Sequence, residues 1–156
     1  MSTARIAAAV LAACAIAVPA EGLRQRAYRD PPGILTVCYG STTNVDPQRT
    51  YTLEECQERL EVDMLRAVST VEGCRPGLPQ NVLVAFSDAV YNMGPTIACD
   101  TQRSTAARLL KAGRYRDACN QLPRWNTARI AGQPVVLPGL VTRRERERAY
   151  CLAGLA

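Results

Sequence analysis

Two carboxylates and a hydroxyl lie close together near the start of this chain: Glu21, Asp30 and Thr36. Cleavage of a glycosidic bond needs a protonated acid on one side of the scissile bond and a carboxylate on the other side that activates water. Glu21 suits the first role at a helix end in a cleft wall, where partial burial favours the protonated form of a carboxyl group. Asp30, on a polar loop, would remain ionised and hold the attacking water together with the Thr36 hydroxyl.

The composition restricts the chemistry further. The 156 residues include no histidine, which excludes Ser-His-Asp catalysis, zinc sites built on histidine and a histidine general base. The cysteines form no CxxC pair, so neither a zinc site nor a thioredoxin-like motif is indicated. Acid–base work near neutral pH must therefore fall to carboxylates, and we expect no metal and no cofactor.

Each of the three candidate residues also has an ordinary structural explanation. Glu21-Gly22 reads as the end of a helix, Asp30-Pro31 as a turn, and Thr36 as a strand residue. A carboxylate at a helix C-terminus opposes the helix dipole, however, which hints at a functional reason for Glu21. Taken singly, each residue is still more readily explained by structure than by catalysis.

The spacing Glu21-(8 residues)-Asp30-(5 residues)-Thr36, with Tyr39 and Gly40 after it, resembles the active-site signature of phage-type, T4-lysozyme-like muramidases. Four later segments also resemble that family: Tyr91-Asn92-Met93-Gly94, Ser104-Thr105, Arg124-Trp125 and the run from Gly139 to Glu145. Residues 21–152 are covered in order. The resemblance implies a glycoside hydrolase that cleaves the β-1,4 bond between N-acetylmuramic acid and N-acetylglucosamine in peptidoglycan and so lyses the host cell as an endolysin. The family is inverting, which implies carboxyl groups about 6.5–9.5 Å apart.

The resemblance also implies a fold and secondary site residues. The fold is α+β, mainly α, a two-lobed lysozyme-like domain with a small β-hairpin lobe and a larger helical lobe. Asn92, Ser104 and Arg143 are candidate substrate contacts, and Arg143 or Arg144 has the alternative role of ordering the loop beneath Glu21. Many relatives have glycine and histidine where this chain has Cys38 and Ser41, which puts only the finer substrate contacts in doubt.

Local sequence signals place the elements of both lobes. Residues 27–51 are rich in Pro, Gly, Thr and Tyr and predict the hairpin lobe. Thr52 and Glu55 form a capping box that opens a long helix ending at Gly73. Further helices are predicted over 81–92, 105–112 and 115–122, with Ser104 as a cap, and 130–139 reads as a loop with two prolines. Thr142 and Glu145 form a second capping box, which predicts a final helix from there to about Leu152.

The N-terminal segment from Ile6 to Ala20 is uncharged but rich in alanine, and it is shorter than the roughly 20 residues that a stable membrane span needs. A cleaved signal peptide fits Arg5 and the small residues near Ala20, but cleavage there would delete the helix that holds Glu21. A soluble amphipathic helix is disfavoured because no polar face is visible. A signal-anchor-release segment, as in a subset of phage endolysins, is the third and favoured interpretation.

This interpretation divides the chain into residues 1–20, an apolar anchor, and residues 21–156, the catalytic domain. Residues 6–20 would hold the protein in the host inner membrane until it is released into the periplasm. No residue separates the apolar run from Glu21, so the anchor would keep this acid at the bilayer surface, away from Asp30 and Thr36.

Seven cysteines indicate an oxidising compartment. Their spacing suggests three sequential disulfides, Cys38–Cys56, Cys74–Cys99 and Cys119–Cys151, although six cysteines allow about fifteen pairings. Cys14 remains unpaired. It is either a small apolar helix residue or, as in some relatives of the family, a thiol that exchanges disulfides after release.

The net charge of +5 and a pI near 9.0 imply attraction to a polyanion. The chain has no recognised nucleic-acid motif, and one Phe and one Trp offer little for base stacking, so we expect no nucleic-acid partner. An anionic bacterial wall or a membrane surface explains the charge equally well; the expected partner is peptidoglycan, and the protein is expected to be a monomer. Three other functions are weighed: a lytic transglycosylase, which needs only one acid, a catalytically inactive wall-binding protein, and a bilayer-disrupting peptide.

Overall fold

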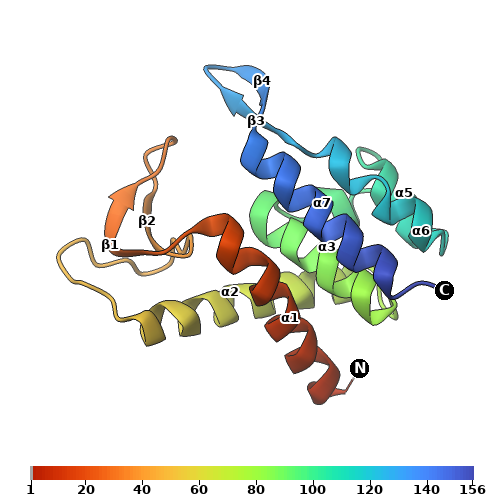
Figure 1. Ribbon diagram of the computed structural model, residues 1–156, viewed down its shortest axis with the longest axis horizontal. Coiled ribbons are helices and arrows are strands. Elements are labelled where there is room, and N and C mark those ends of the chain that lie inside the picture. The colour runs from red at the N-terminus through yellow and green to blue at the C-terminus, as the bar shows by residue number, and fades with distance from the viewer. Residues whose placement is uncertain (1) are drawn as a thin grey trace.

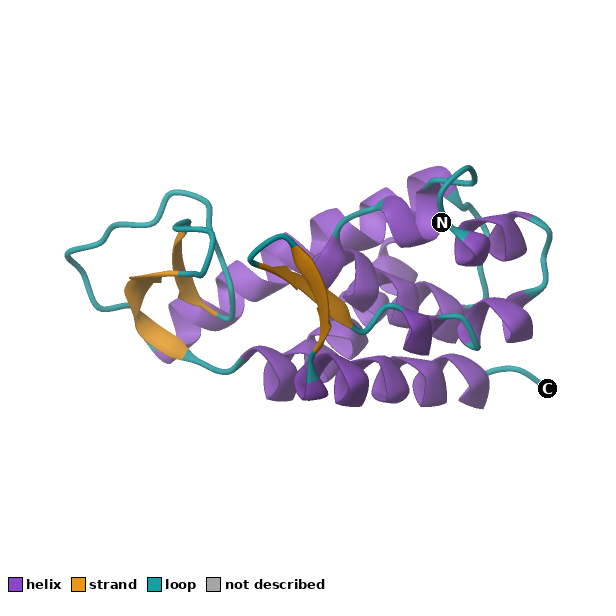
Figure 2. Cartoon of the chain, turned by 90° about the horizontal axis from the view of Figure 1, so that it is seen from above, coloured by secondary structure: helices purple, strands orange, loops and turns teal. Residues whose placement is uncertain are grey.

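The computed structural model describes residues 2–156. A small lobe with strands β1 and β2 lies at one end and a larger helical lobe at the other, and α2 extends from beneath the small lobe to the larger one (Figure 1). The view from above shows the same separation of the β1–β2 lobe from the packed helices (Figure 2). The predicted class, mainly α with a small hairpin lobe, is confirmed.

The small lobe is built on β1 (Arg24–Arg29) and β2 (Leu35–Cys38), which pair antiparallel with Tyr28 opposite Thr36. Asp30 shapes the connecting turn, because its Oδ1 accepts the N–H of Ile34 at 2.7 Å. The first strand begins three residues before the predicted boundary of the lobe. Its exposed polar residues give little apolar signal, and backbone pairing rather than burial defines it.

Helix α2 (Leu53–Cys74) connects the lobes and begins at the predicted capping box. The Thr52 hydroxyl accepts the N–H of Glu55, and the Glu55 carboxylate accepts the N–H of Thr52, so both free donors of the first turn are satisfied. The helix continues through Gly73 to Cys74 rather than ending at the glycine.

The helical lobe is centred on α3 (Gln80–Met93), whose residues from Val82 to Val90 are all buried. Helices α1 (Thr3–Glu21), α2 and α7 (Pro138–Ala153) pack around it. The remaining elements are α4 (Thr96–Cys99), α5 (Thr105–Lys111), α6 (Tyr115–Cys119) and a 3-10 turn, η1 (Leu122–Arg124). The predicted helices over 81–92 and 105–112 are confirmed within a residue or two.

The prediction of a loop over residues 130–139 is wrong. This region belongs to a second hairpin, β3 (Thr127–Ile130) and β4 (Gln133–Val136), which projects from the helical lobe (Figure 1). The tight turn uses Ala131 and Gly132, both with positive φ (50° and 78°), as two-residue hairpin turns require. Most side chains of both strands are exposed, so the sequence shows no alternation of apolar and polar residues that would predict them.

The predicted start of the final helix is also wrong. Helix α7 begins at Pro138, in the first turn where proline is favoured, and its N-cap residue Leu137 makes no side-chain cap. Thr142 therefore lies inside the helix, where its hydroxyl donates to the Pro138 carbonyl at 3.2 Å instead of capping Glu145. The fixed φ of proline outweighs the capping-box pattern.

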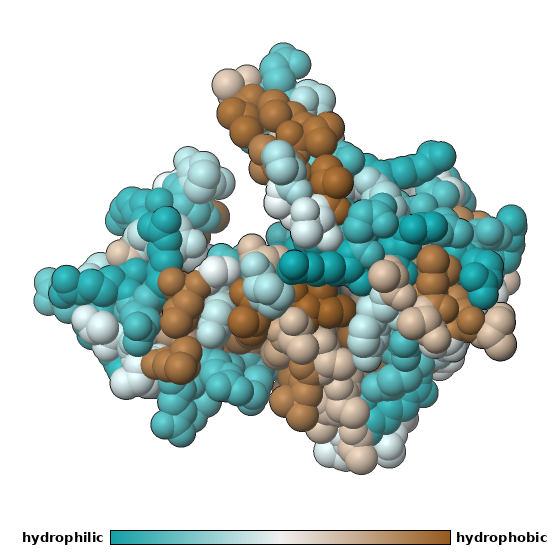
Figure 3. Space-filling model, in the orientation of Figure 1, coloured by the Kyte–Doolittle hydropathy of each residue, from teal (hydrophilic) through white to brown (hydrophobic). Residues whose placement is uncertain are grey.

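Helix α1 packs along the core rather than standing apart from it. Ala9, Ala13 and Ala17, spaced four residues apart, are fully buried against the neighbouring helices, whereas Leu11 is 60% exposed. Figure 3 shows apolar surface over α1 and on the β3–β4 hairpin. By length and composition alone, α1 is also able to cross a membrane, with a mean hydropathy of 1.8. The helix runs without a break into Glu21, across the 20/21 boundary.

Disulfides fasten the connections between elements at the pairings that the sequence suggested. Cys38–Cys56 joins β2 to α2, Cys74–Cys99 joins the end of α2 to α4, and Cys119–Cys151 joins α6 to α7. Among residues 2–156, Cys14 is the cysteine outside a disulfide, and it is buried in α1. Each bridge closes a loop across elements that are already packed together.

Candidate active site

A hollow of about 230 Å³ lies between the lobes. The space-filling view shows the molecule hollowed between the small lobe and the β3–β4 side of the large lobe (Figure 3). The lining residues come from the end of α1, from both strands of the first hairpin, from the following loop and from α3: Glu21, Tyr28, Asp30, Thr36, Gly40, Thr42, Tyr91 and Asn92. The fold thus brings the three predicted catalytic side chains to one cavity.

Glu21 is the last residue of α1, and Gly22 with φ +70° turns the chain away from the helix. The Glu21 side chain is 21% exposed and forms an ion pair with Arg143. Arg143 also donates to both oxygens of the buried Asp88, at 2.9 and 2.8 Å. The Arg143 guanidinium therefore binds two carboxylates, Glu21 at the surface of the cleft and Asp88 behind it.

The contacts of Arg143 are with protein carboxylates, and its predicted contact with substrate stays a prediction. Its side chain is only 3% exposed, and its donors are directed at Glu21 and Asp88. Burial lowers and these two carboxylates raise the pKa of Arg143, and the net shift is upward, which keeps the guanidinium charged. The alternative role, support beneath Glu21, is the one that the contacts favour.

Asp30 and Thr36 are held by the hairpin backbone. Asp30 Oδ1 is fixed by the N–H of Ile34, which leaves Oδ2 as the oxygen that a water molecule can approach. The Thr36 hydroxyl donates to the Ile34 carbonyl at 2.9 Å. A hydroxyl has one hydrogen to donate, so the Thr36 oxygen can only accept a hydrogen bond from a water in the cleft.

Tyr91 connects the two lobes at the floor of the cleft. Its hydroxyl donates to the Tyr39 carbonyl at 2.6 Å, and burial together with the charge of Glu21 raises the pKa of the phenol, which therefore stays protonated. Gly40 follows with φ +97°, and a Cβ at this position would lie 3.4 Å from Glu21 Oε2. A side chain at position 40 would thus contact the proposed acid, and the positive φ favours glycine there.

The two other candidate substrate contacts have different outcomes. Asn92 lines the cleft, and its Oδ1 accepts from Arg144 at 2.9 Å, which leaves the amide nitrogen free to face substrate. Its role in binding stays a prediction. The prediction for Ser104 is wrong, because this side chain is fully buried, donates to the Ile97 carbonyl at 2.7 Å and caps α5 through the N–H of Ala107. Capping, not substrate contact, explains the serine.

Sequence reasoning missed the supporting residues Tyr28, Tyr91, Asp88 and Glu147. One signal was available for Tyr28, which lies two positions before Asp30 and so on the same face of an extended strand. Another was Asp88, a charge within the mostly apolar segment from Val82 to Val90. Across residues 2–156, no group of three His, Cys, Asp or Glu side chains is arranged to hold a metal ion.

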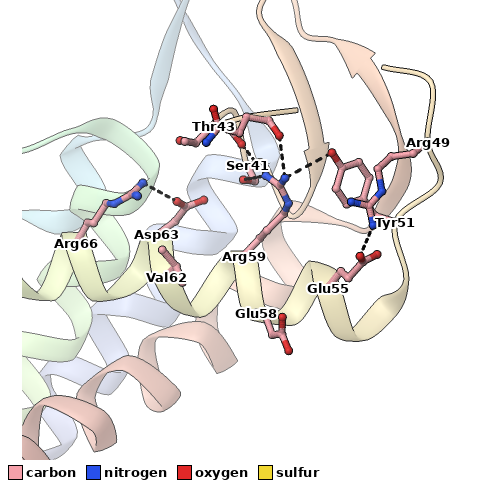
Figure 4. A pocket seen from close by; sticks show the side chains of 11 residues that line it. Ser41, Thr43, Arg49, Tyr51, Glu55, Glu58, Arg59, Val62, Asp63 and Arg66 are labelled. Carbon is pink, nitrogen blue, oxygen red and sulfur yellow. Dashed lines mark hydrogen bonds and ion pairs between the residues drawn. The ribbon is translucent and has the colours of Figure 1, made fainter. Parts of the chain in front are cut away.

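A second hollow of about 380 Å³ lies between α2 and the loop after β2 (Figure 4). Arg59 of α2 donates to the Ser41 hydroxyl, to the carbonyls of Thr43 and Asn44 and to the Tyr51 hydroxyl. Figure 4 shows this fan of contacts directed from the helix into the loop. Arg59 therefore fastens to α2 the segment that continues the wall of the cleft beyond Gly40.

Comparison with known proteins gives consistent matches. A family model described as phage lysozyme matches residues 19–147. A SAR-endolysin of Pseudomonas phage phiKMV is 38% identical over 146 residues, which cover 93% of this chain and 89% of that protein. The active form of the P1 phage endolysin Lyz has a TM-score of 0.80 at 26% identity, covering 100% of this chain and 96% of that one. Its secreted inactive form has a TM-score of 0.54 at 27% identity, covering 73% and 77%.

Proposed function

Because this chain belongs to the phage lysozyme family and is an endolysin, a muramidase that hydrolyses peptidoglycan, we propose that Glu21, Asp30 and Thr36 carry out the hydrolysis. Glu21 is the general acid. It gives its proton to the oxygen of the scissile β-1,4 bond as the sugar leaves, and Arg143 then stabilises the carboxylate that remains. Arg143 also pairs with Asp88, so its positive charge is divided between two carboxyl groups. Before the reaction it therefore attracts Glu21 less strongly than an unshared counter-ion would.

Asp30 and Thr36 position the water on the opposite side of the sugar ring. Both present acceptors, Asp30 through Oδ2 and Thr36 through the hydroxyl oxygen whose hydrogen is already donated to Ile34. A water that donates its two hydrogens to these groups directs a lone pair at the anomeric carbon. Asp30 takes the proton during the attack, and the configuration of that carbon is inverted. The orientation of the Thr36 hydroxyl is the observation that carries this proposal.

Three variants test the roles separately, on purified wall with release of reducing ends as the measure. We expect Glu21→Gln and Asp30→Asn each to lower kcat by about 10²–10⁴-fold, the usual contribution of a positioned acid or base. Thr36→Val keeps the shape of the side chain and should cost less. Glu58→Gln, on the outer part of α2, is the matched control. Full activity of Asp30→Asn with anhydro ends in the product would instead support a lytic transglycosylase, and lysis by inactive Glu21→Gln would support bilayer disruption.

We further propose that residues 6–20 form a releasable anchor, which holds the enzyme in the host inner membrane before it acts in the periplasm. Three observations support this: the membrane-compatible length and composition of α1, the name of the phiKMV relative, and the greater likeness to the active than to the secreted inactive P1 endolysin. The docked α1 contributes Glu21, so the cleft is complete only when the helix has left the bilayer.

The anchor is tested by fractionation of cells that express the Glu21→Gln variant, which cannot lyse them. We expect the full-length protein in the membrane fraction, with transfer to the periplasm after an uncoupler collapses the membrane potential. A periplasmic protein that lacks residues 1–20 from the outset would instead identify a cleaved signal peptide.

A further inference from the structure

A cluster of buried charges lies directly behind Glu21. Arg143 pairs with Glu21 and with Asp88, Arg144 pairs with Glu147 at 2.7 Å, and Arg143 Nε lies 3.8 Å from Glu147. Asp88, Arg144 and Glu147 are completely buried. Asp88 and Glu147 are two carboxyl groups buried next to each other, and two neighbouring negative charges away from water repel strongly. One of these two carboxyl groups is therefore expected to hold a proton.

The contacts indicate which carboxyl group this is. Asp88 accepts from Arg143 with both oxygens, at 2.8 and 2.9 Å, as an ionised carboxylate does. Glu147 uses only Oε1, toward Arg144, whereas its buried Oε2 has no partner within residues 2–156. The Glu147 carboxyl lies within hydrogen-bond reach of Asp88, and burial together with this contact raises the pKa of Glu147 well above its usual range. Two adjacent buried carboxyl groups share a proton rather than both ionising.

We propose that Glu147 is a neutral acid in the folded enzyme, that its Oε2–H donates to Asp88, and that this proton positions Arg143 between Asp88 and Glu21. A neutral Glu147 does not compete for the Arg143 guanidinium, which keeps its donors for Asp88 and for the acid in the cleft. Glu147 is thus a positioning residue that acts through Asp88 and Arg143. The inference rests on the proposed role of Glu21 as general acid.

The groups around Glu147 come from several elements. Arg143 and Arg144 share α7 with it, Asp88 faces it from α3, and Glu21 reaches Arg143 from the end of α1. Tyr91 of α3 places its ring 6.0 Å from the Arg143 guanidinium, on the side toward the cleft. Glu147 is the member of this set with an unused buried oxygen, so the proton is assigned there.

Thermal unfolding as a function of pH tests the protonation state. In Glu147→Gln the amide can still donate to Asp88 and accept from Arg144. The raised pKa means that wild-type protein takes up a proton on folding, so its stability falls as the pH rises above about 4.3, the usual value for glutamate in an unfolded chain. The variant takes up none. Relative to wild type, the folding equilibrium of Glu147→Gln should therefore improve up to about tenfold per pH unit between pH 5 and 7.

The proposal is overturned if the variant is destabilised by an amount that stays constant above pH 5.5, because that result requires an ionised Glu147. If Glu147→Gln does not fold, infrared spectra of the Glu21→Gln variant decide, because that variant lacks the proton of Glu21. A carboxylic-acid C=O band at neutral pH, recorded in D2O after exchange of the amide protons, supports the neutral acid. Its absence contradicts it.

Activity tests the positioning role. Asp88→Asn removes the carboxylate with which Glu21 shares Arg143, so the alkaline limb of the kcat/KM profile should move to lower pH. Glu147→Leu should lower kcat at least tenfold with KM little changed, and Glu147→Gln should restore much of that loss. Equal impairment of the leucine and glutamine variants, or an unmoved limb in Asp88→Asn, refutes the role. Glu145→Gln, exposed on the same helix, is the control.

The outcomes separate this inference from the proposed function. If Glu21→Gln retains activity, the general-acid role itself fails, whatever Glu147 does. If Glu21→Gln is inactive but the stability of Glu147→Gln shows no gain with rising pH, only the shared proton is refuted.

Discussion

A matched pair of alanine substitutions separates the two states that α1 is proposed to occupy. Ala13 and Ala15 both lie in the apolar run, but in the docked helix Ala13 is fully buried and Ala15 is exposed. Replacing either by leucine adds three carbon atoms, which favour the bilayer by about 2.4 kcal/mol at ~0.8 kcal/mol for each buried carbon. The docked state gains little from a leucine at position 15, because that side chain remains in water. The equilibrium of Ala15→Leu should therefore shift toward the membrane by roughly fifty-fold.

Ala13→Leu shifts toward the membrane by more than this. The added carbons must enter a packed interface, and overpacking costs a further 1–3 kcal/mol or so in the docked state. The two variants thus gain the same affinity for lipid, but only Ala13→Leu destabilises the packing of α1 in the docked state. Ala15→Ser is the opposite control and should leave the membrane sooner than wild type.

Two measurements distinguish these effects. The fraction of protein that sediments with membranes at a fixed time after uncoupling should rise in both leucine variants, and lysis should be delayed. Once extracted in detergent and purified, Ala15→Leu should hydrolyse wall at the wild-type rate, whereas Ala13→Leu should remain impaired because Glu21 is misplaced. Release of Ala15→Leu at the wild-type rate would refute the anchor, and equal activity of both purified leucine variants would refute the docked geometry.

Three further results are expected. Cys14 is buried in the docked α1, so in native protein at pH 8 its thiol should react with a disulfide reagent far more slowly than after unfolding. Fast native labelling would show that α1 is not docked. Arg59→Ala removes charged hydrogen bonds to the loop after β2 and should lower the free energy of unfolding by about 1.5–3 kcal/mol, measured in urea. An unchanged urea midpoint would show that the loop is held by other contacts. Gly40→Ala places a side chain beside Glu21 on a backbone with φ +97°, and it should reduce kcat more than it reduces binding of wall fragments. A change in KM alone would contradict the placement of Gly40 beside Glu21.

The long helices could be predicted from the sequence because local signals agreed with the tertiary packing. Thr52 and Glu55 fix the start of α2, and the segment from Val82 to Val90 is apolar apart from Ser87 and Asp88 because α3 is surrounded by other helices. The catalytic candidates were found because their residue types and spacing resemble the family signature. Glu21 ends α1, Asp30 follows β1 and Thr36 lies in β2, and the fold brings all three to one cavity.

Other features depend on contacts that are remote in sequence. Asp88 and Arg143 are 55 residues apart, and neither carries a local sign that they meet behind Glu21. The β3–β4 hairpin has no buried face, so backbone pairing and a turn at Ala131 form it without an apolar pattern. Ser104 was correctly identified as a cap, but the family resemblance also suggested a substrate contact that its burial rules out.

The unbroken passage of α1 into Glu21 constrains how this protein can diverge over time. One residue inserted between the apolar run and Glu21 would rotate the carboxylate by about 100° and move it about 1.5 Å along the axis, out of register with the cleft. Changes in the strength of the anchor are therefore expected to accumulate as replacements within the run, or as lengthening on the side of the run away from Glu21. Insertions and deletions next to the glutamate should be selected against, even where membrane retention alone would tolerate them.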